Sequence, residues 1–133
     1  MPASQPGARR APLQLSLTSL PGVRYWTEAE ARAFLPRARE LVEVIQEAAA
    51  VAARAAGNGQ GHTRDDAGAA LAELEGQSII VRDPEAGLID FPARGADGVL
   101  YLLCYRLDED DLGFWHLPED GFAGRRPLPR DPE

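Results

Sequence analysis

The chain has 133 residues, of which 44% are hydrophobic and 26% charged, a composition typical of one soluble globular domain. Its formal net charge of -7 argues against nucleic-acid binding, because phosphate contacts need a basic face. No segment approaches the ~20 apolar residues of a membrane span, and no signal-peptide core follows Arg9 and Arg10. We therefore expect an acidic, cytoplasmic protein that does not associate with membranes.

Lysine is missing from the sequence, so all 14 basic residues are arginine. This excludes Schiff-base chemistry, a pyridoxal-phosphate lysine and a P-loop lysine. Cys104 is the single cysteine, which excludes an internal disulfide and a thiolate metal cluster. On these grounds the sequence predicts no cofactor.

Composition divides the chain into three parts. Residues 1–24 are rich in proline, glycine and small polar residues, and we interpret them as a flexible N-terminal arm. Residues 25–128 carry the periodic patterns of a single α+β domain, and residues 129–133 form a tail. Within the domain we expect helices over 27–56 and 65–75, a sheet over 78–117 and a C-terminal arm over 118–128.

The first helix has the clearest signals. Thr27 followed by Glu30 forms a capping box, in which each side chain bonds the backbone N–H of the other residue. Apolar residues then recur at three- and four-residue spacing, which predicts one buried stripe. Pro36 interrupts the first turns, so we expect a kink or a fresh helix start there. The stripe comprises Phe34, Leu35, Ala38, Leu41, Val42, Ile45, Ala48, Ala49 and Ala52.

A glycine-rich linker over 57–62 joins this helix to the second one, and the pair is predicted to form an antiparallel hairpin. The first helix is much the longer of the two. One end of it must therefore project from the domain or pack against another subunit. Together with a central strand that is apolar on both faces, this leads us to expect a homodimer.

From residue 78 onward the pattern changes to short apolar runs separated by turn residues, which predicts a three- or four-stranded antiparallel sheet. The run over 99–107 is apolar on both faces until Arg106. Both faces of the sheet should therefore be covered, one by the helical hairpin and the other by the C-terminal arm or a partner.

Four blocks of the sequence resemble a known family. They are YWTEAEARAFLP at the start of the first helix, GLIDFPA at 87–93, LLCYRL at 102–107 and FWH with GFAGRRPL near the C-terminus. Together they are similar to a prokaryotic family known as domain of unknown function 2203, over about residues 25–128. The resemblance implies a small α+β protein with a helical hairpin, and it implies no activity, substrate or catalytic residue.

Asp90 and His116 are candidate site residues. Asp90 lies within an apolar strand, and a buried carboxylate needs a partner, for which Arg125 or Arg106 is the obvious choice. A structural ion pair is one interpretation, and a general base or ligand-binding carboxylate is the other. His116, next to Trp115, is interpreted either as a hydrogen-bonded structural residue or as part of a site.

The segment over 118–128 combines two glycines with two arginines. Gly121 and Gly124 could let a ligand approach the backbone, and Arg125 could bind a small anion. The alternative is a purely structural arm, held by Phe122 in the core and by Arg125 on Asp90.

Cysteine and metal chemistry receive less support. A dyad of Cys104 and His116 would require both on one face of adjacent strands. The spacing of His62 and His116 supports no metal site. The acidic run over 108–111 lacks the glycine and the glutamate of a calcium loop, so no metal is expected.

The sequence therefore supports two functional hypotheses. The first is a non-enzymatic interaction or scaffolding protein that forms a homodimer and binds an unknown protein. The second is a domain that binds a small molecule or small anion, or an enzyme, with a polar site of Asp90, His116 and Arg125. The broader candidate cluster adds Arg106, Trp115, Gly121 and Gly124.

Overall fold

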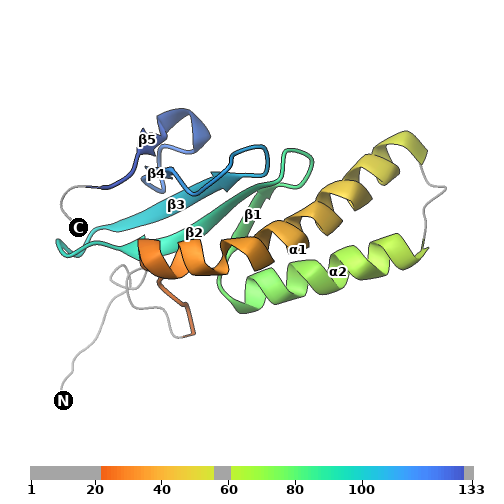
Figure 1. The fold of residues 1–133 in the computed structure, drawn as a ribbon, viewed down its shortest axis with the longest axis horizontal. Coiled ribbons are helices and arrows are strands. Elements are labelled where there is room, and N and C mark those ends of the chain that lie inside the picture. Colours follow the sequence, from red (N-terminus) through yellow and green to blue (C-terminus); the bar gives the residue numbers. More distant parts are fainter. Residues whose placement is uncertain (1–21, 56–60, 131–133) are drawn as a thin grey trace, which may run out of the picture.

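The computed structural model describes residues 22–55 and 61–130. A helical hairpin precedes an antiparallel sheet, which confirms the α+β fold (Figure 1). The sheet has five strands in the order β1-β2-β3-β4-β5, where three or four were expected. The elements are α1 (Glu28–Ala55), α2 (Gly61–Gly76), β1 (Ile80–Asp83), β2 (Leu88–Arg94), β3 (Leu100–Arg106), β4 (Phe114–His116), the 3-10 turn η3 (Phe122–Gly124) and β5 (Arg126–Pro127). Most of the expected N-terminal arm, the linker as far as residue 60 and the last three residues of the expected tail lie outside the described residues.

Helix α1 begins with the capping box that the sequence predicts. The Thr27 backbone N–H donates to Glu30 Oε1 at 3.0 Å, and the Glu30 N–H donates to Thr27 Oγ1 at 3.0 Å. Pro36 lies inside α1, where its side chain is exposed, and no second helix begins there. The 28 residues extend over about 42 Å at 1.5 Å per residue.

Helix α2 begins at Gly61, four residues before the position expected from the sequence, and its 16 residues run antiparallel to α1 (Figure 1). The two helices lie on one face of the sheet, and the end of the hairpin projects beyond it. Ile45 is the last buried residue of α1, so the projecting part has no buried side chain among those described. As expected, the longer helix extends past the domain core.

Alternation along the strands gives the sheet two different faces. Ile89 and Phe91 of β2 point toward the helices, together with Leu103 and Tyr105 of β3, and these side chains belong to the main core. The residues that alternate with these along each strand point away from the helices. The face that they form is called here the outer face. Several of these are also buried, namely Asp90, Pro92, Leu102, Cys104 and His116.

Trp26 fastens the start of α1 to the sheet. Its backbone N–H donates to the carbonyl of Pro92 at 2.7 Å, and its indole Nε1 donates to the carbonyl of Gln77 at 3.0 Å. Its ring meets Phe91 edge-on, with centroids 5.1 Å apart, and the guanidinium of Arg24 covers it at 3.5 Å. The segment before α1 is thereby tied to β2 and to the residue that follows α2.

The C-terminal arm returns to the sheet and adds a strand at its edge. Arg126 pairs with Trp115 and Pro127 with Phe114, which adds β5 beside β4. The expected anchors of this arm are wrong in two respects. Phe122 is 41% exposed rather than in the core, and the carboxylate that Arg125 contacts belongs to Glu109 rather than to Asp90.

Gly87 supplies a testable prediction on the β1–β2 turn. Its φ is +70°, and a Cβ there would lie 2.6 Å from Leu107 Cβ. We expect Gly87→Ala to lower the free energy of unfolding by more than about 1 kcal/mol, from left-handed backbone strain plus the clash. Denaturant unfolding measures this.

Gly68 provides the matched control. It lies exposed inside α2, and a Cβ added there would meet nothing within 4 Å. Gly68→Ala should therefore raise the free energy of unfolding by about 0.5–1 kcal/mol. A Gly87→Ala protein as stable as the parent would contradict the close approach of Gly87 to Leu107.

Candidate polar site on the outer face

Three consecutive strands place Asp90, Cys104 and His116 together on the outer face of the sheet. Asp90 of β2 lies directly opposite Cys104 of β3, and His116 of β4 lies opposite Leu102, two residues before Cys104. Because side chains two residues apart share a face, the three polar groups point the same way. All three are buried, with exposed fractions of 2% or less.

The carboxylate of Asp90 has two cationic or polar partners. Arg82 of β1 donates from Nε to Asp90 Oδ2 at 2.8 Å, and His116 Nε2 lies 3.1 Å from both carboxylate oxygens. The expectation that Arg125 or Arg106 pairs with Asp90 is therefore wrong. Arg82 was missed in the sequence, although the short turn between β1 and β2 brings it close to Asp90.

The other ring nitrogen of His116 is held by the backbone. Nδ1 lies 2.8 Å from the carbonyl oxygen of Leu117, and a carbonyl only accepts, so the proton must be on Nδ1. In a neutral imidazole this leaves Nε2 as a bare acceptor facing the two acceptor oxygens of Asp90. Two acceptors do not bond each other, so a proton or a metal ion must lie between Nε2 and the carboxylate.

Cys104 completes the cluster. Burial, reinforced by the charge of Asp90, raises the pKa of the Cys104 thiol to about 12. A free thiol here is consequently neutral near pH 7 and a poor nucleophile. The ligand atoms of Asp90, Cys104 and His116 lie within 4.8 Å of one another, so this set could hold a metal ion.

A pocket of about 360 Å³ opens onto these three groups. Gly121 and Phe122 of the C-terminal arm contribute to its wall, and Arg82 and Pro118 also line it. Arg82 and Pro118 also line a neighbouring groove of about 700 Å³, so the two spaces adjoin. The groove is mostly apolar and includes Val23, Tyr25, Ile80, Pro92, Leu100 and Leu102.

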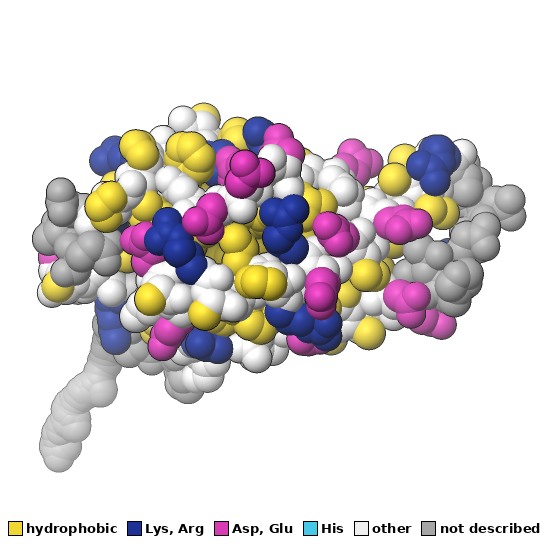
Figure 2. Space-filling model, viewed as in Figure 1, with side chains coloured by type: hydrophobic (Ala, Val, Ile, Leu, Met, Phe, Trp, Pro, Cys, Tyr) yellow, Lys and Arg dark blue, Asp and Glu magenta, His cyan; other side chains and the backbone are white. Residues whose placement is uncertain are grey.

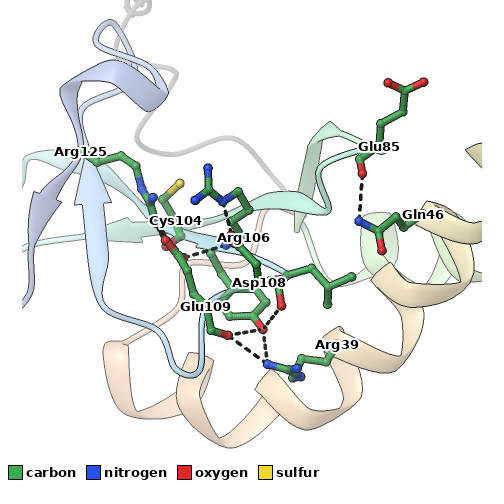
Figure 3. Close-up of polar contacts among 10 residues, drawn as sticks. Arg39, Gln46, Glu85, Cys104, Arg106, Asp108, Glu109 and Arg125 are labelled. Atoms are coloured by element: carbon green, nitrogen blue, oxygen red, sulfur yellow. Dashed lines mark hydrogen bonds and ion pairs between the residues drawn. The ribbon is translucent and has the colours of Figure 1, made fainter. Parts of the chain in front are cut away.

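Arg125 belongs to a separate polar network (Figure 3). It donates to Glu109 at 2.8 Å and approaches the carbonyl of Cys104 at 3.5 Å. Arg39 of α1 donates to the carbonyl of the same Glu109 at 3.1 Å and also bonds the hydroxyl of Tyr105. This network joins α1, the β3–β4 turn and the C-terminal arm.

The remaining predicted residues lie apart from the pocket. Arg106 is paired with Asp108 at 2.7 Å (Figure 3). Trp115 faces the helices and meets Tyr101 edge-on, with centroids 5.8 Å apart. Gly124 lies in η3 against Asp120. The structure therefore brings together Asp90, His116 and Gly121 from the predicted cluster and leaves out Arg106, Trp115, Gly124 and Arg125.

The surface has no strong charge polarity on the side that Figure 2 shows, where arginine and acidic side chains alternate over the helices. Within residues 22–55 and 61–130, no helix has both the length and the apolar character to cross a bilayer.

The comparisons with known proteins identify one family. The model for an uncharacterized conserved protein, domain of unknown function 2203, matches residues 24–128, and the chain belongs to this family. No curated protein and no solved structure matches the chain.

The raised pKa of the Cys104 thiol predicts how the stability of the fold depends on pH. Its pKa in the folded protein is raised above the ordinary value of 9.0, so the folded state holds its proton when the unfolded state has lost it. This stabilisation is complete below about pH 9 and is lost as the pH rises toward 12. We expect the melting temperature of the metal-free protein to fall over this interval.

Cys104→Ala serves as the comparison, because it removes the titrating group. The fall in melting temperature between about pH 9 and 11 should be smaller in this variant. Equal slopes in the two proteins would show that Cys104 does not titrate differently in the folded and unfolded states.

Proposed function

We propose that this member of the family binds a small amphipathic anion, with its charged head beside Arg82 and its apolar body in the adjoining groove. One observation carries the proposal, namely that a pocket lined by the buried Asp90 and His116 adjoins an apolar groove, with Arg82 and Pro118 lining both. Ligand sites in proteins typically combine an apolar lining with a few convergent polar groups.

Arg82 is suited to hold the head group. Its side chain is 43% exposed, and among the described residues it bonds only through Nε, to Asp90. The terminal guanidinium nitrogens remain for a ligand, and a planar guanidinium matches a carboxylate or phosphate in two-point contact. Asp90 orients Arg82 through this bond, and His116 Nε2 contacts the same carboxylate.

The groove accounts for the apolar part of the ligand. Ile80, Pro92, Leu100 and Leu102 lie on the outer face beside the polar pocket. Water over such a surface is released when an apolar chain or ring covers it, which contributes about 25 cal/mol per Å² of apolar area buried. A purely polar anion would gain nothing from this surface.

The proposal predicts a graded response to ligand chemistry. Medium-chain carboxylates should raise the melting temperature of the full chain, whereas acetate and the matching alcohols should raise it less. Arg82→Gln should weaken carboxylate binding about tenfold or more, as expected for the loss of a charge-assisted contact of ~1.5–3 kcal/mol. Isothermal titration calorimetry measures the affinities.

Arg64→Gln is the control, because Arg64 is an exposed arginine of α2 away from the pocket. It should leave the affinity unchanged. The proposal is overturned if carboxylates, alcohols and acetate bind alike, or if Arg82→Gln and Arg64→Gln have the same effect.

Homodimer formation is a second candidate, and the projecting end of the helical hairpin favours it (Figure 1). Val44 is 36% exposed on α1, and the turns that follow carry a run of alanines and Val51 with no buried residue among those described after Ile45. Two such hairpin ends could pack against each other as an antiparallel bundle with close backbone contact. Such a dimer would leave the outer-face pocket open.

Light scattering at micromolar concentration tests the dimer. We expect a mass of two chains, and Val44→Glu together with Val51→Glu should reduce it to that of one chain. A monomer in the parent protein at these concentrations would contradict the dimer and would leave the ligand proposal intact.

A further inference from the structure

We infer that Asp90, Cys104 and His116 form a mononuclear site for a divalent transition metal of the zinc class, with one coordination position open to the pocket. The inference deepens the proposed function and rests on the same pocket, where the metal would lie under the head group of the ligand. The three residues come from three different strands, and their ligand atoms lie within 4.8 Å of one another.

The spacing of the ligand atoms fits a tetrahedral ion. Two ligand atoms at ~2.1 Å from a tetrahedral metal lie about 3.4 Å apart, and His116 Nε2 and Asp90 Oδ1 are 3.1 Å apart. A thiolate binds at the slightly longer distance of ~2.3 Å, and Cys104 lies beside both on the central strand. Small side-chain rotations therefore complete three of four positions.

The surroundings of the cluster match those of metal ligands. His116 Nδ1–H donates to the carbonyl of Leu117, which directs the lone pair of Nε2 into the cluster. Arg82 holds Asp90 through Oδ2, which leaves Oδ1 as the coordinating oxygen. Metal-binding histidines and carboxylates characteristically have such second hydrogen bonds.

Charge also favours a cation at this place. The bare Nε2 of a neutral His116 faces two carboxylate oxygens at 3.1 Å, and acceptors at this distance need a proton or a metal ion between them. On metal binding, the Cys104 thiol releases its proton to solvent, and the metal ion displaces the proton between His116 Nε2 and the Asp90 carboxylate. A divalent ion with one thiolate, one carboxylate and one neutral imidazole then has a net charge of zero.

The donor types select the metal. One sulfur, one nitrogen and one oxygen donor suit Zn²⁺ or Co²⁺, whereas Mg²⁺ and Ca²⁺ prefer oxygen ligands alone. Three protein ligands and an open fourth position are the arrangement of zinc sites that bind an exchangeable group. The open position faces the pocket, where an anionic head group could coordinate the metal and bond Arg82 together.

The test uses the full chain, stripped of metal with a chelator and titrated with Co²⁺ and then Zn²⁺ under reducing conditions. We expect one equivalent of Co²⁺ to bind with a sulfur-to-cobalt charge-transfer band in the near ultraviolet and with the intense visible bands of a tetrahedral ion. One equivalent of Zn²⁺ should abolish both signals. Mg²⁺ at the same concentration should not compete.

Variants assign the ligands. Cys104→Ser should abolish the charge-transfer band, and Asp90→Asn and His116→Gln should each weaken Co²⁺ binding about tenfold or more. Glu40→Gln and Asp110→Asn are the controls, because these residues line neither the pocket nor the cluster, and both should bind as the parent does. Circular dichroism establishes that each variant is folded, and Cys104→Ala replaces Cys104→Ser if the latter is not.

Absence of stoichiometric binding by the folded parent would overturn the metal site, as would a charge-transfer band that survives in Cys104→Ser. In that outcome the cluster is a hydrogen-bonded ion pair only. Carboxylates that still bind the metal-free parent through Arg82 would then uphold the proposed function. Conversely, stoichiometric metal binding without any carboxylate binding would uphold the metal site and reject the proposed function.

Discussion

The buried charge of Asp90 constrains the sheet more than any other single group. A carboxylate removed from water costs several kcal/mol unless partners replace its hydration. Its partners come from β1 and β4, so Arg82, Asp90 and His116 link strands on both sides of β3. A shift of one residue in any of these strands would turn its polar group to the helix side. The ionic cluster therefore specifies the register of the sheet together with the apolar core.

Much of the fold is encoded in local patterns that can be recognised in the amino-acid sequence. The capping box of α1, its apolar stripe and the short strands bounded by glycine and proline each arise from interactions within a few residues. The two-residue strand β5 was not predictable in this way. Arg126 and Pro127 have no alternating apolar pattern, and they become a strand only because β4 offers an unpaired edge.

The candidate site shows the corresponding limit. Asp90 and His116 could be singled out because a charged group and an imidazole interrupt apolar runs, but their partners depend on strand pairing. Judged by residue type alone, Arg125 is as plausible a partner for Asp90 as Arg82 is. Tertiary packing nevertheless directs Arg125 to Glu109. Cys104 lies among leucines and reads as a core residue until the register places it opposite Asp90. The sequence thus identifies the buried polar residues better than it identifies their hydrogen-bond and ion-pair partners.

The order of the strands has a consequence for synthesis on the ribosome. Each strand pairs with the one made just before it, so the sheet can grow as the chain emerges, with the helices already available to cover one face. Arg82 reaches Asp90 early, whereas His116 and the arm that walls the pocket arrive only with the last residues of the domain. Until then the nascent chain presents an apolar outer face on which the carboxylate of Asp90 is paired with Arg82 alone. The C-terminal arm of the domain is therefore the segment that ends this exposure to chaperones and to other unfinished chains.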